Sequence, residues 1–195
     1  MTDPEYTALV VSRICHDLVS PLGAIANGVE LLSMSGAGPE VALIAESVAN
    51  ANARIRAFRI AFGAAEPGQR VTRAELAALV EDLTRGGRLS IRWPLASDIE
   101  RREAKLVLLA LQCLETLMPW GAEVRVDQGP AGTTVDGRAV RMRAEPDLLA
   151  RLAGNGPGTP PEAAQVQFDL LPREAAAQGR ALAVAPRSDG LVLTF

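Results

Sequence analysis

The chain has 195 residues and a formal net charge of −3, with 48% hydrophobic and 22% charged residues. This length and balance are typical of a folded protein with room for one large domain or two small ones. The negative charge argues against a general nucleic-acid binder, because such proteins need a basic surface to displace phosphate counterions.

The two cysteines, Cys15 and Cys113, are too few for a disulfide framework and lack metal-ligand spacing. Each lies in an apolar stretch, which favours a small buried side chain. The N-terminal MTDPEYTALV has neither the basic nor the apolar region of a signal peptide. No uninterrupted apolar run approaches the ~20 residues that span a bilayer. We therefore expect a soluble cytoplasmic protein.

The first third of the chain predicts two long antiparallel helices. Apolar residues recur at steps of three and four, a heptad-like stripe that comprises Val11, Cys15, Leu18, Leu22, Ile25, Val29 and Leu32. A segment with two glycines and a proline, 33–40, predicts the helix–helix connection. The stripe then resumes at Val41, Ile44, Val48, Asn52, Ile55, Arg59 and Phe62. Two such hairpins complete a four-helix bundle by dimerising, so we expect a homodimer joined through residues 1–64.

After a linker at 65–70, residues 71–195 predict an α+β sandwich of helices on a largely antiparallel sheet. Two capping boxes, Thr72 with Glu75 and Ser97 with Glu100, indicate helix starts. Expected helices cover 72–83, 105–117 and a stretch that ends near 178 after a Gly/Pro-rich loop at 154–161. Alternating patterns predict strands at 87–93, 122–126, 137–143, 180–185 and 190–195, the third of them after an Asp136-Gly137 turn.

His16 is the only histidine of the chain. On a helix that turns by ~100° per residue, it points about 150° away from the apolar stripe and therefore toward solvent. Small and polar residues share its side of the helix: Arg13, Ser20, Gly23 and Asn27.

The surroundings of His16 favour some kinds of chemistry over others. A metal site would need further ligands at helical spacing, and position 20 is a serine. A Ser20–His16 nucleophilic pair is conceivable, but an open helix offers no obvious oxyanion hole. A nucleophilic imidazole fits best, because neutral histidine is available near neutral pH and Asp17 can fix its tautomer. Gly23 leaves room for a partner's backbone, although a tolerated helix-weakening glycine explains it equally well.

The segment HDLVSPLGAI resembles the H-box of sensor histidine kinases, H-[ED]-L-x-[TS]-P-L-x-x-I. The matching positions are His16, Asp17, Leu18, Ser20, Pro21, Leu22 and Ile25. Pro21 is expected to loosen the helix locally. The resemblance implies that His16 is a phosphoacceptor.

The segment 106–126 resembles the part of the kinase ATP-binding domain in which an apolar helix leads through a proline turn into a strand. Aligned on Pro119, Leu109 and Cys113 replace the asparagines of the kinase N-box and Thr116 replaces its lysine. Apolar side chains cannot coordinate Mg²⁺. The kinase Asp-x-Gly-x-Gly box is also missing, and GNGPG (154–158) is more typical of a flexible connection than of a phosphate loop. We expect no intrinsic cofactor or metal.

A kinase-like hairpin followed by a degenerate ATPase-like domain resembles the ChpT-type histidine phosphotransferases of bacterial phosphorelays. RAFRIAFGAA (56–65) also resembles the end of that family's second helix. The resemblance implies a homodimer in which His16 takes a phosphoryl group from a receiver-domain aspartate of a hybrid kinase and passes it to a response regulator. Asp17 would orient His16, and Ser20 would hydrogen-bond the ring, the phosphoryl group or the partner. The receiver would supply Mg²⁺, and the second domain would serve docking.

Within this interpretation, Arg13, Gly23 and Asn27 are expected to contact the receiver, with weaker support for arginines 54, 56 and 59. Two other functions stay open. An ATP-dependent kinase with an atypical nucleotide site would phosphorylate itself from ATP. A non-catalytic dimeric adaptor would bind receivers even after His16→Ala. In neither case do we expect nucleic acid or a membrane as a partner.

Overall fold

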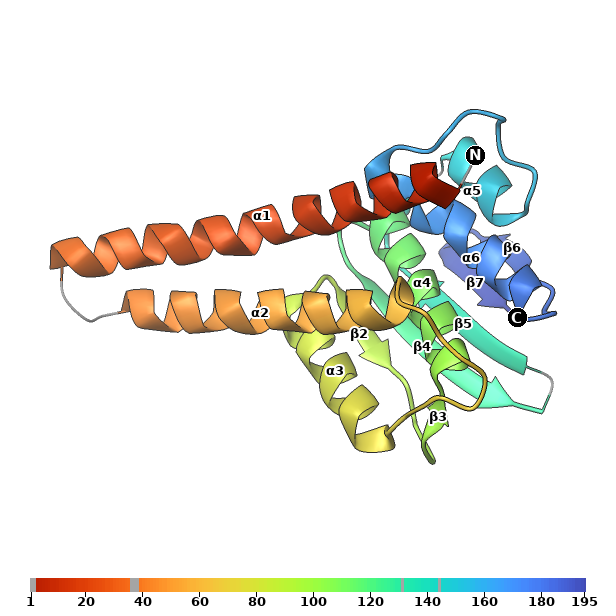
Figure 1. Ribbon diagram of the computed structural model, residues 1–195, viewed down its shortest axis with the longest axis horizontal. Coiled ribbons are helices and arrows are strands. Elements are labelled where there is room, and N and C mark those ends of the chain that lie inside the picture. Colours follow the sequence, from red (N-terminus) through yellow and green to blue (C-terminus); the bar gives the residue numbers. More distant parts are fainter. Residues whose placement is uncertain (1–2, 36–38, 131, 144) are drawn as a thin grey trace.

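A helical hairpin projects from an α+β domain in the computed structural model, which describes residues 3–35, 39–130, 132–143 and 145–195 (Figure 1). Helix α1 spans Asp3–Ser35 and α2 spans Pro39–Ala61. Pro39 suits the start of a helix, because a proline lacks only an N–H that would stay unpaired there. The connection predicted at 33–40 is too long, since helix covers both of its ends; residues 36–38 lie outside the described residues.

About half of the apolar stripe of the hairpin is exposed in the single chain. Leu22 is 57% and Val29 53% exposed on α1, and Val48 and Ile55 are both 41% exposed on α2. Cys15 is exposed as well, so the prediction that it is buried is wrong in the single chain. We call this side of the hairpin the apolar seam; its exposed members are Val11, Cys15, Leu22, Val29, Val41, Val48 and Ile55.

A different side of α1 packs against α2. A Cβ atom at Gly28 would lie 2.5 Å from Cγ1 of Ile44, so the glycine permits this close approach.

By length and composition alone, α1 between Glu5 and Leu32 could also cross a membrane.

The α+β class and the largely antiparallel sheet are confirmed. Five strands lie in the order β2–β4–β5–β7–β6. Of the neighbouring pairs described, β2–β4 is parallel and the other three are antiparallel. Their bounds are β2 Leu89–Arg92, β4 Ala122–Gly129, β5 Gly132–Arg138, β6 Ala183–Arg187 and β7 Gly190–Thr194. Two short strands, β1 Arg70–Val71 and β3 Ile99–Glu100, pair separately.

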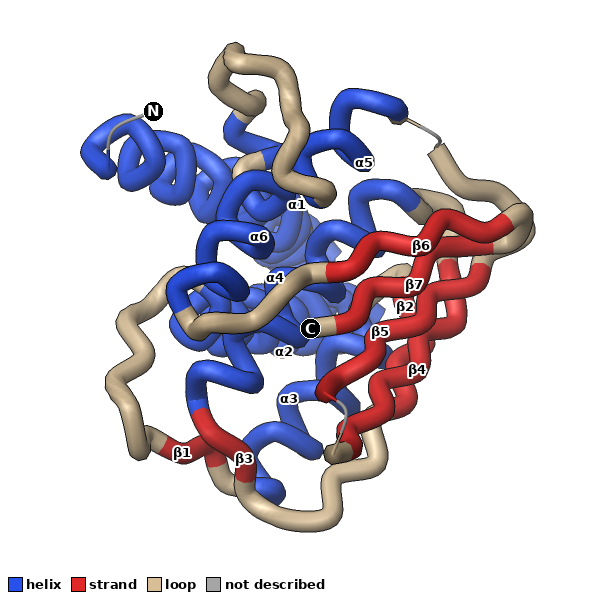
Figure 2. The backbone as a smooth tube through the Cα atoms, turned by 90° about the vertical axis from the view of Figure 1, so that its right-hand side faces the viewer, coloured by secondary structure: helices blue, strands red, loops and turns tan. Residues whose placement is uncertain are grey.

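The helices of this domain gather on one face of the sheet (Figure 2). They are α3 Arg73–Gly86, α4 Arg101–Leu117, α5 Pro146–Leu152 and α6 Gln167–Ala177, preceded by the 3₁₀ turn η1 at Ala163–Gln165. Helix α4 is the centre of the core, with Leu106, Cys113 and Leu114 fully buried. Phe168 and Leu171 of α6 complete the same core.

The N-cap bond of one of the two predicted capping boxes forms. The backbone N–H of Glu75 donates to Oγ1 of Thr72 at 3.1 Å and begins α3. The Ser97–Glu100 box is wrong, because Glu100 pairs with β1 and α4 begins directly after it. Oδ1 of Asp98 instead accepts a hydrogen bond from the backbone N–H of Arg73 at 2.8 Å, so the loop that contains Asp98 helps to cap α3.

The Asp136-Gly137 turn is also wrong. Both residues lie inside β5, which spans 132–138 instead of 137–143. A Cβ atom at Gly137 would lie 2.9 Å from the Leu114 side chain, so close packing on α4 explains the glycine. The chain turns between Gly129 and Gly132, and Gly132 has a φ of +119°.

Candidate functional site

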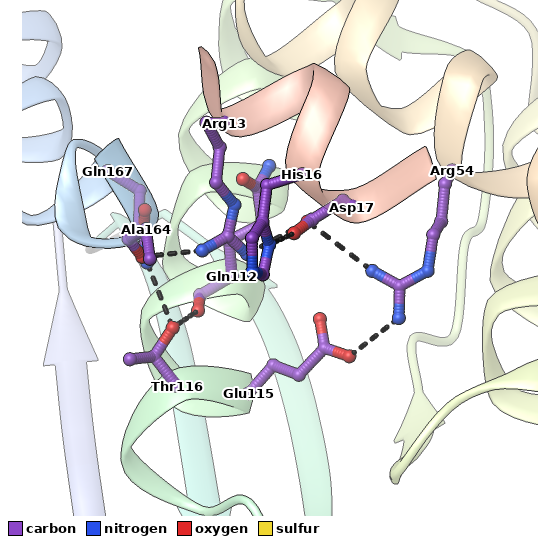
Figure 3. Close-up of polar contacts among 9 residues, drawn as sticks. All are labelled: Arg13, His16, Asp17, Arg54, Gln112, Glu115, Thr116, Ala164 and Gln167. Carbon is purple, nitrogen blue, oxygen red and sulfur yellow. Dashed lines mark hydrogen bonds and ion pairs between the residues drawn. The ribbon is translucent and has the colours of Figure 1, made fainter. Parts of the chain in front are cut away.

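His16 lies where the hairpin meets the C-terminal domain (Figure 3). Its side chain is 74% exposed, whereas that of Asp17 is only 8% exposed. Nδ1 of His16 lies 3.1 Å from Oδ1 of Asp17. A carboxylate can only accept, so a neutral imidazole makes this bond by donating Nδ1–H. Nε2 is then the nitrogen that carries the free lone pair.

The other carboxylate oxygen of Asp17 faces two arginines. Oδ2 lies 3.0 Å from Nη2 of Arg13 and 3.5 Å from Nη1 of Arg54. Nη2 of Arg54 in turn donates to Oε1 of Glu115, on α4, at 3.2 Å. Asp17 therefore turns one oxygen toward the imidazole and the other toward a pair of guanidinium groups.

Arg13 does not belong to the exposed face, so the prediction that it shares the solvent-exposed side of His16 is wrong, and its role in docking stays a prediction. The residue is 7% exposed, and Nη1 donates to the carbonyl oxygen of Ala164 in η1. Three residues before His16, Arg13 lies about 60° around the helix from it. That rotation is enough to place Arg13 under the C-terminal domain.

Ser20, Gly23 and Asn27 are exposed, as predicted for the side of α1 that carries His16. A Cβ atom at Gly23 would have nothing within 4 Å. The exposure of this small, polar face is confirmed, and its role in docking stays a prediction.

The three arginines of α2 have separate surroundings. Arg54 pairs with Asp17 and Glu115, and Arg56 pairs with Asp82 of α3. Arg59 is exposed.

A groove of about 610 Å³ opens beside His16, between the hairpin and the C-terminal domain. Its polar lining comes from both sides and includes Ser20, Glu46, Asn50, Arg54, Arg88, Glu115 and Arg143. Glu115 and its neighbour Gln112 were not singled out in the sequence. The available signal was that both are polar residues within a mostly apolar helix, KLVLLALQCLETL.

The positions that correspond to the kinase N-box have become part of the core. Leu109 is 1% exposed and Cys113 is fully buried, and burial raises the pKa of the Cys113 thiol. Oγ1 of Thr116 donates to the carbonyl oxygen of Gln112 and accepts from Nε2 of Gln167. Among the residues that the structure describes, no cluster of three or more His, Cys, Asp or Glu side chains could hold a metal ion.

Known proteins resemble the chain in both sequence and fold. Residues 73–190 match the family described as "Histidine phosphotransferase C-terminal domain". The chain is 36% identical over 180 residues to the protein phosphotransferase ChpT of Brucella abortus (strain 2308), a match that covers 87% of this chain and 85% of that protein. A solved bacterial phosphotransferase is 29% identical and superposes with a TM-score of 0.82, over 100% of this chain and 97% of the other.

Proposed function

Because this chain belongs to the ChpT-type histidine phosphotransferases of bacterial phosphorelays, we propose that His16 is its phosphoacceptor. The observation that carries the proposal is the pairing of an exposed imidazole with a buried carboxylate. His16 is 74% and Asp17 8% exposed, and Nδ1 and Oδ1 are 3.1 Å apart. One ring nitrogen is therefore held by the protein while the ring stays open to a protein partner.

In the proposed reaction, Nε2 of His16 attacks the phosphorus of an aspartyl phosphate on a receiver domain. The N–P bond forms as the acyl O–P bond breaks, and the receiver aspartate leaves as a carboxylate. The phosphorylated ring keeps its Nδ1 proton, and the Asp17 carboxylate stabilises the resulting positive charge. Attack by the aspartate of a second receiver then breaks the N–P bond and restores neutral His16.

Positioning and charge neutralisation dominate such a transfer, because the protein has little covalent work to do. We assign Mg²⁺ to the receiver partner. Ser20, which lines the same groove, is proposed to hydrogen-bond the ring or the phosphoryl group. Gly23 and Asn27 extend the same exposed face, so they are proposed to contact receiver domains of a hybrid kinase and of response regulators.

The apolar seam supports a homodimer. Large apolar side chains at heptad spacing on both helices are typical of a surface that a second copy covers. Two hairpins joined there would form a four-helix bundle. The seam also accounts for the apolar composition of α1. Arg13 and Asp17 of that helix pair with each other, and Arg13 also contacts the C-terminal domain, so we propose a cytoplasmic dimer instead of a membrane-bound chain.

The test follows labelled phosphate from a phosphorylated receiver domain onto the wild-type chain and onto His16→Ala. An incubation with ATP alone is the control. We expect acid-labile, alkali-stable label on the wild type and none on His16→Ala or from ATP. Label from ATP would indicate a kinase. Receivers that bind without ever transferring label would indicate an adaptor, and His16 would lose its assigned role.

A further inference from the structure

We propose that the C-terminal domain positions the phosphoacceptor, because Glu115 holds Arg54 against Asp17 and Asp17 in turn orients His16. This proposal rests on the assignment of His16 as the phosphoacceptor. It gives the degenerate domain a part in the chemistry in addition to docking. Arg54 and Glu115 are positioning residues in this account, since neither contacts the imidazole.

The division of the Asp17 carboxylate is the first argument. Oδ1 is 3.1 Å from the imidazole, while Oδ2 is 3.0 Å from Arg13 and 3.5 Å from Arg54. Rotation of the carboxylate to improve either contact would weaken the other. The arginines therefore fix the direction in which Oδ1 meets His16.

Burial is the second argument. The side chains of Arg13 and Asp17 are 9% and 8% exposed, so water cannot replace a lost partner as it does on the surface. A buried carboxylate requires paired charges to stay ionised and ordered. The exposed imidazole has no comparable packing of its own, which makes the Asp17 orientation decisive for the tautomer.

Both arginines are anchored on the C-terminal domain. Arg13 reaches the carbonyl oxygen of Ala164 in η1, and Arg54 reaches Glu115 on α4 (Figure 3). Arg54 uses Nη1 for Asp17 and Nη2 for Glu115. A planar guanidinium can bridge two carboxylates in this way, whereas the point charge of a lysine cannot hold both.

A second ion pair supplies a matched control. Arg56, two residues further along α2, also reaches the C-terminal domain, where it pairs with Asp82. No contact of Arg56 with Asp17 occurs among the described residues. The Arg56→Ala variant therefore weakens the hairpin–domain contact without touching the carboxylate that faces His16.

The single histidine allows a direct readout. In a tag-free, ¹⁵N-histidine-labelled chain, every imidazole ¹⁵N signal belongs to His16, and protonated and unprotonated ring nitrogens have well-separated shifts. In the wild type, at a pH where the imidazole ring is neutral, we expect its single proton on Nδ1. Asp17→Asn, Arg54→Ala and Glu115→Gln should all shift the balance toward Nε2–H, whereas Arg56→Ala should match the wild type.

Single-turnover transfer from a phosphorylated receiver gives the second readout. Arg54→Ala should slow transfer roughly tenfold, the low end of what loss of a residue that orients a ligand costs at metal sites, with the receiver Kd unchanged. Arg54→Lys should recover part of that rate. Far-ultraviolet circular dichroism and the dimer mass confirm that each variant is folded.

Two results would overturn the proposal. An unchanged His16 spectrum in Arg54→Ala together with a raised receiver Kd would make Arg54 a docking residue. If Arg54→Ala changed the His16 spectrum but Glu115→Gln left it as in the wild type, Arg54 would need no support from Glu115 of the C-terminal domain. Because the spectra come from the free chain, they test the positioning even if His16 proves not to accept phosphate.

Discussion

The hairpin leaves Leu22 and Val29 more than half exposed, at 57% and 53%, whereas the C-terminal domain buries Leu106 and Phe168 completely. A single chain therefore completes the core of the C-terminal domain but not that of the hairpin. The difference leaves the apolar seam of the hairpin uncovered in one chain, which is the surface that the proposed second copy would cover. It also separates two sides of α1, one apolar and exposed and the other polar and bound to the domain.

The largest expected effect is on the closed core. Phe168→Ala should lower the free energy of unfolding by about 3–5 kcal/mol, because it removes a fully buried aromatic ring and leaves a cavity. Urea denaturation measures the loss. Val140→Ala, at a fully exposed position, should stay within about 0.5 kcal/mol of the wild type. Equal losses in the two variants would contradict the assigned core.

A charge in the apolar seam should break the dimer but leave the domain folded. Leu22→Asp places two carboxylates in the proposed interface, and like charges there cost several kcal/mol, about 100-fold or more in the dimer dissociation constant. Sedimentation equilibrium measures that constant. Val140→Asp, on the C-terminal domain, is the matched control. A Leu22→Asp variant that stays dimeric at low concentration would place the dimer contact elsewhere.

Thiol labelling compares the two regions within one molecule. Cys15 lies in the apolar seam and Cys113 in the closed core. Maleimide should modify Cys15 slowly in the dimer and faster in Leu22→Asp. Cys113 should react only after unfolding, because it is fully buried and its raised pKa keeps the thiol protonated. Mass spectrometry of peptides follows each site. Rapid Cys15 labelling of the wild-type dimer would argue against the seam as its interface.

The smallest expected effect is a pH dependence within the C-terminal domain. Burial raises the pKa of Glu174, but hydrogen bonds from Lys105 and Gln178 outweigh it, and the net pKa is lowered. Since the ionised form is favoured by folding, its contribution is present above the ordinary glutamate pKa of about 4.3 and is lost as pH falls through the lower folded value. Lys105→Met should remove about 0.5–1 kcal/mol near pH 7 and less at a pH below the lowered folded pKa of Glu174.

Urea denaturation at both pH values measures that difference between Lys105→Met and the wild type. A constant difference across the range would show that the Lys105–Glu174 pair, with its 2.7 Å contact, does not cause it.

Local signals in the sequence predicted local structure well. The Thr72 cap and the exposure of His16 depend on neighbouring residues, and both are confirmed. Two closing strands also form, although β6 spans 183–187 instead of the predicted 180–185. The alternation of apolar residues also predicted the sheet class. These features need no knowledge of what lies across the fold.

Errors arose where a distant segment decides the environment of a residue. Arg13 is buried by η1, about 150 residues along the chain, which helical phase cannot reveal. Gly137 reads as a turn but is required by packing against Leu114. The role of Glu115 was missed for the same reason, since its partner Arg54 belongs to another domain.

The most direct test of the central claim is the identity of the phosphorylated atom. The single histidine of the ¹⁵N-labelled chain, once phosphorylated by a receiver domain, shows by ¹⁵N and ³¹P spectroscopy which ring nitrogen carries phosphorus. Our account predicts phosphorus on Nε2 of His16 and a proton on Nδ1, which donates a hydrogen bond to Asp17. Phosphorus on Nδ1, or on any residue other than His16, would contradict the account.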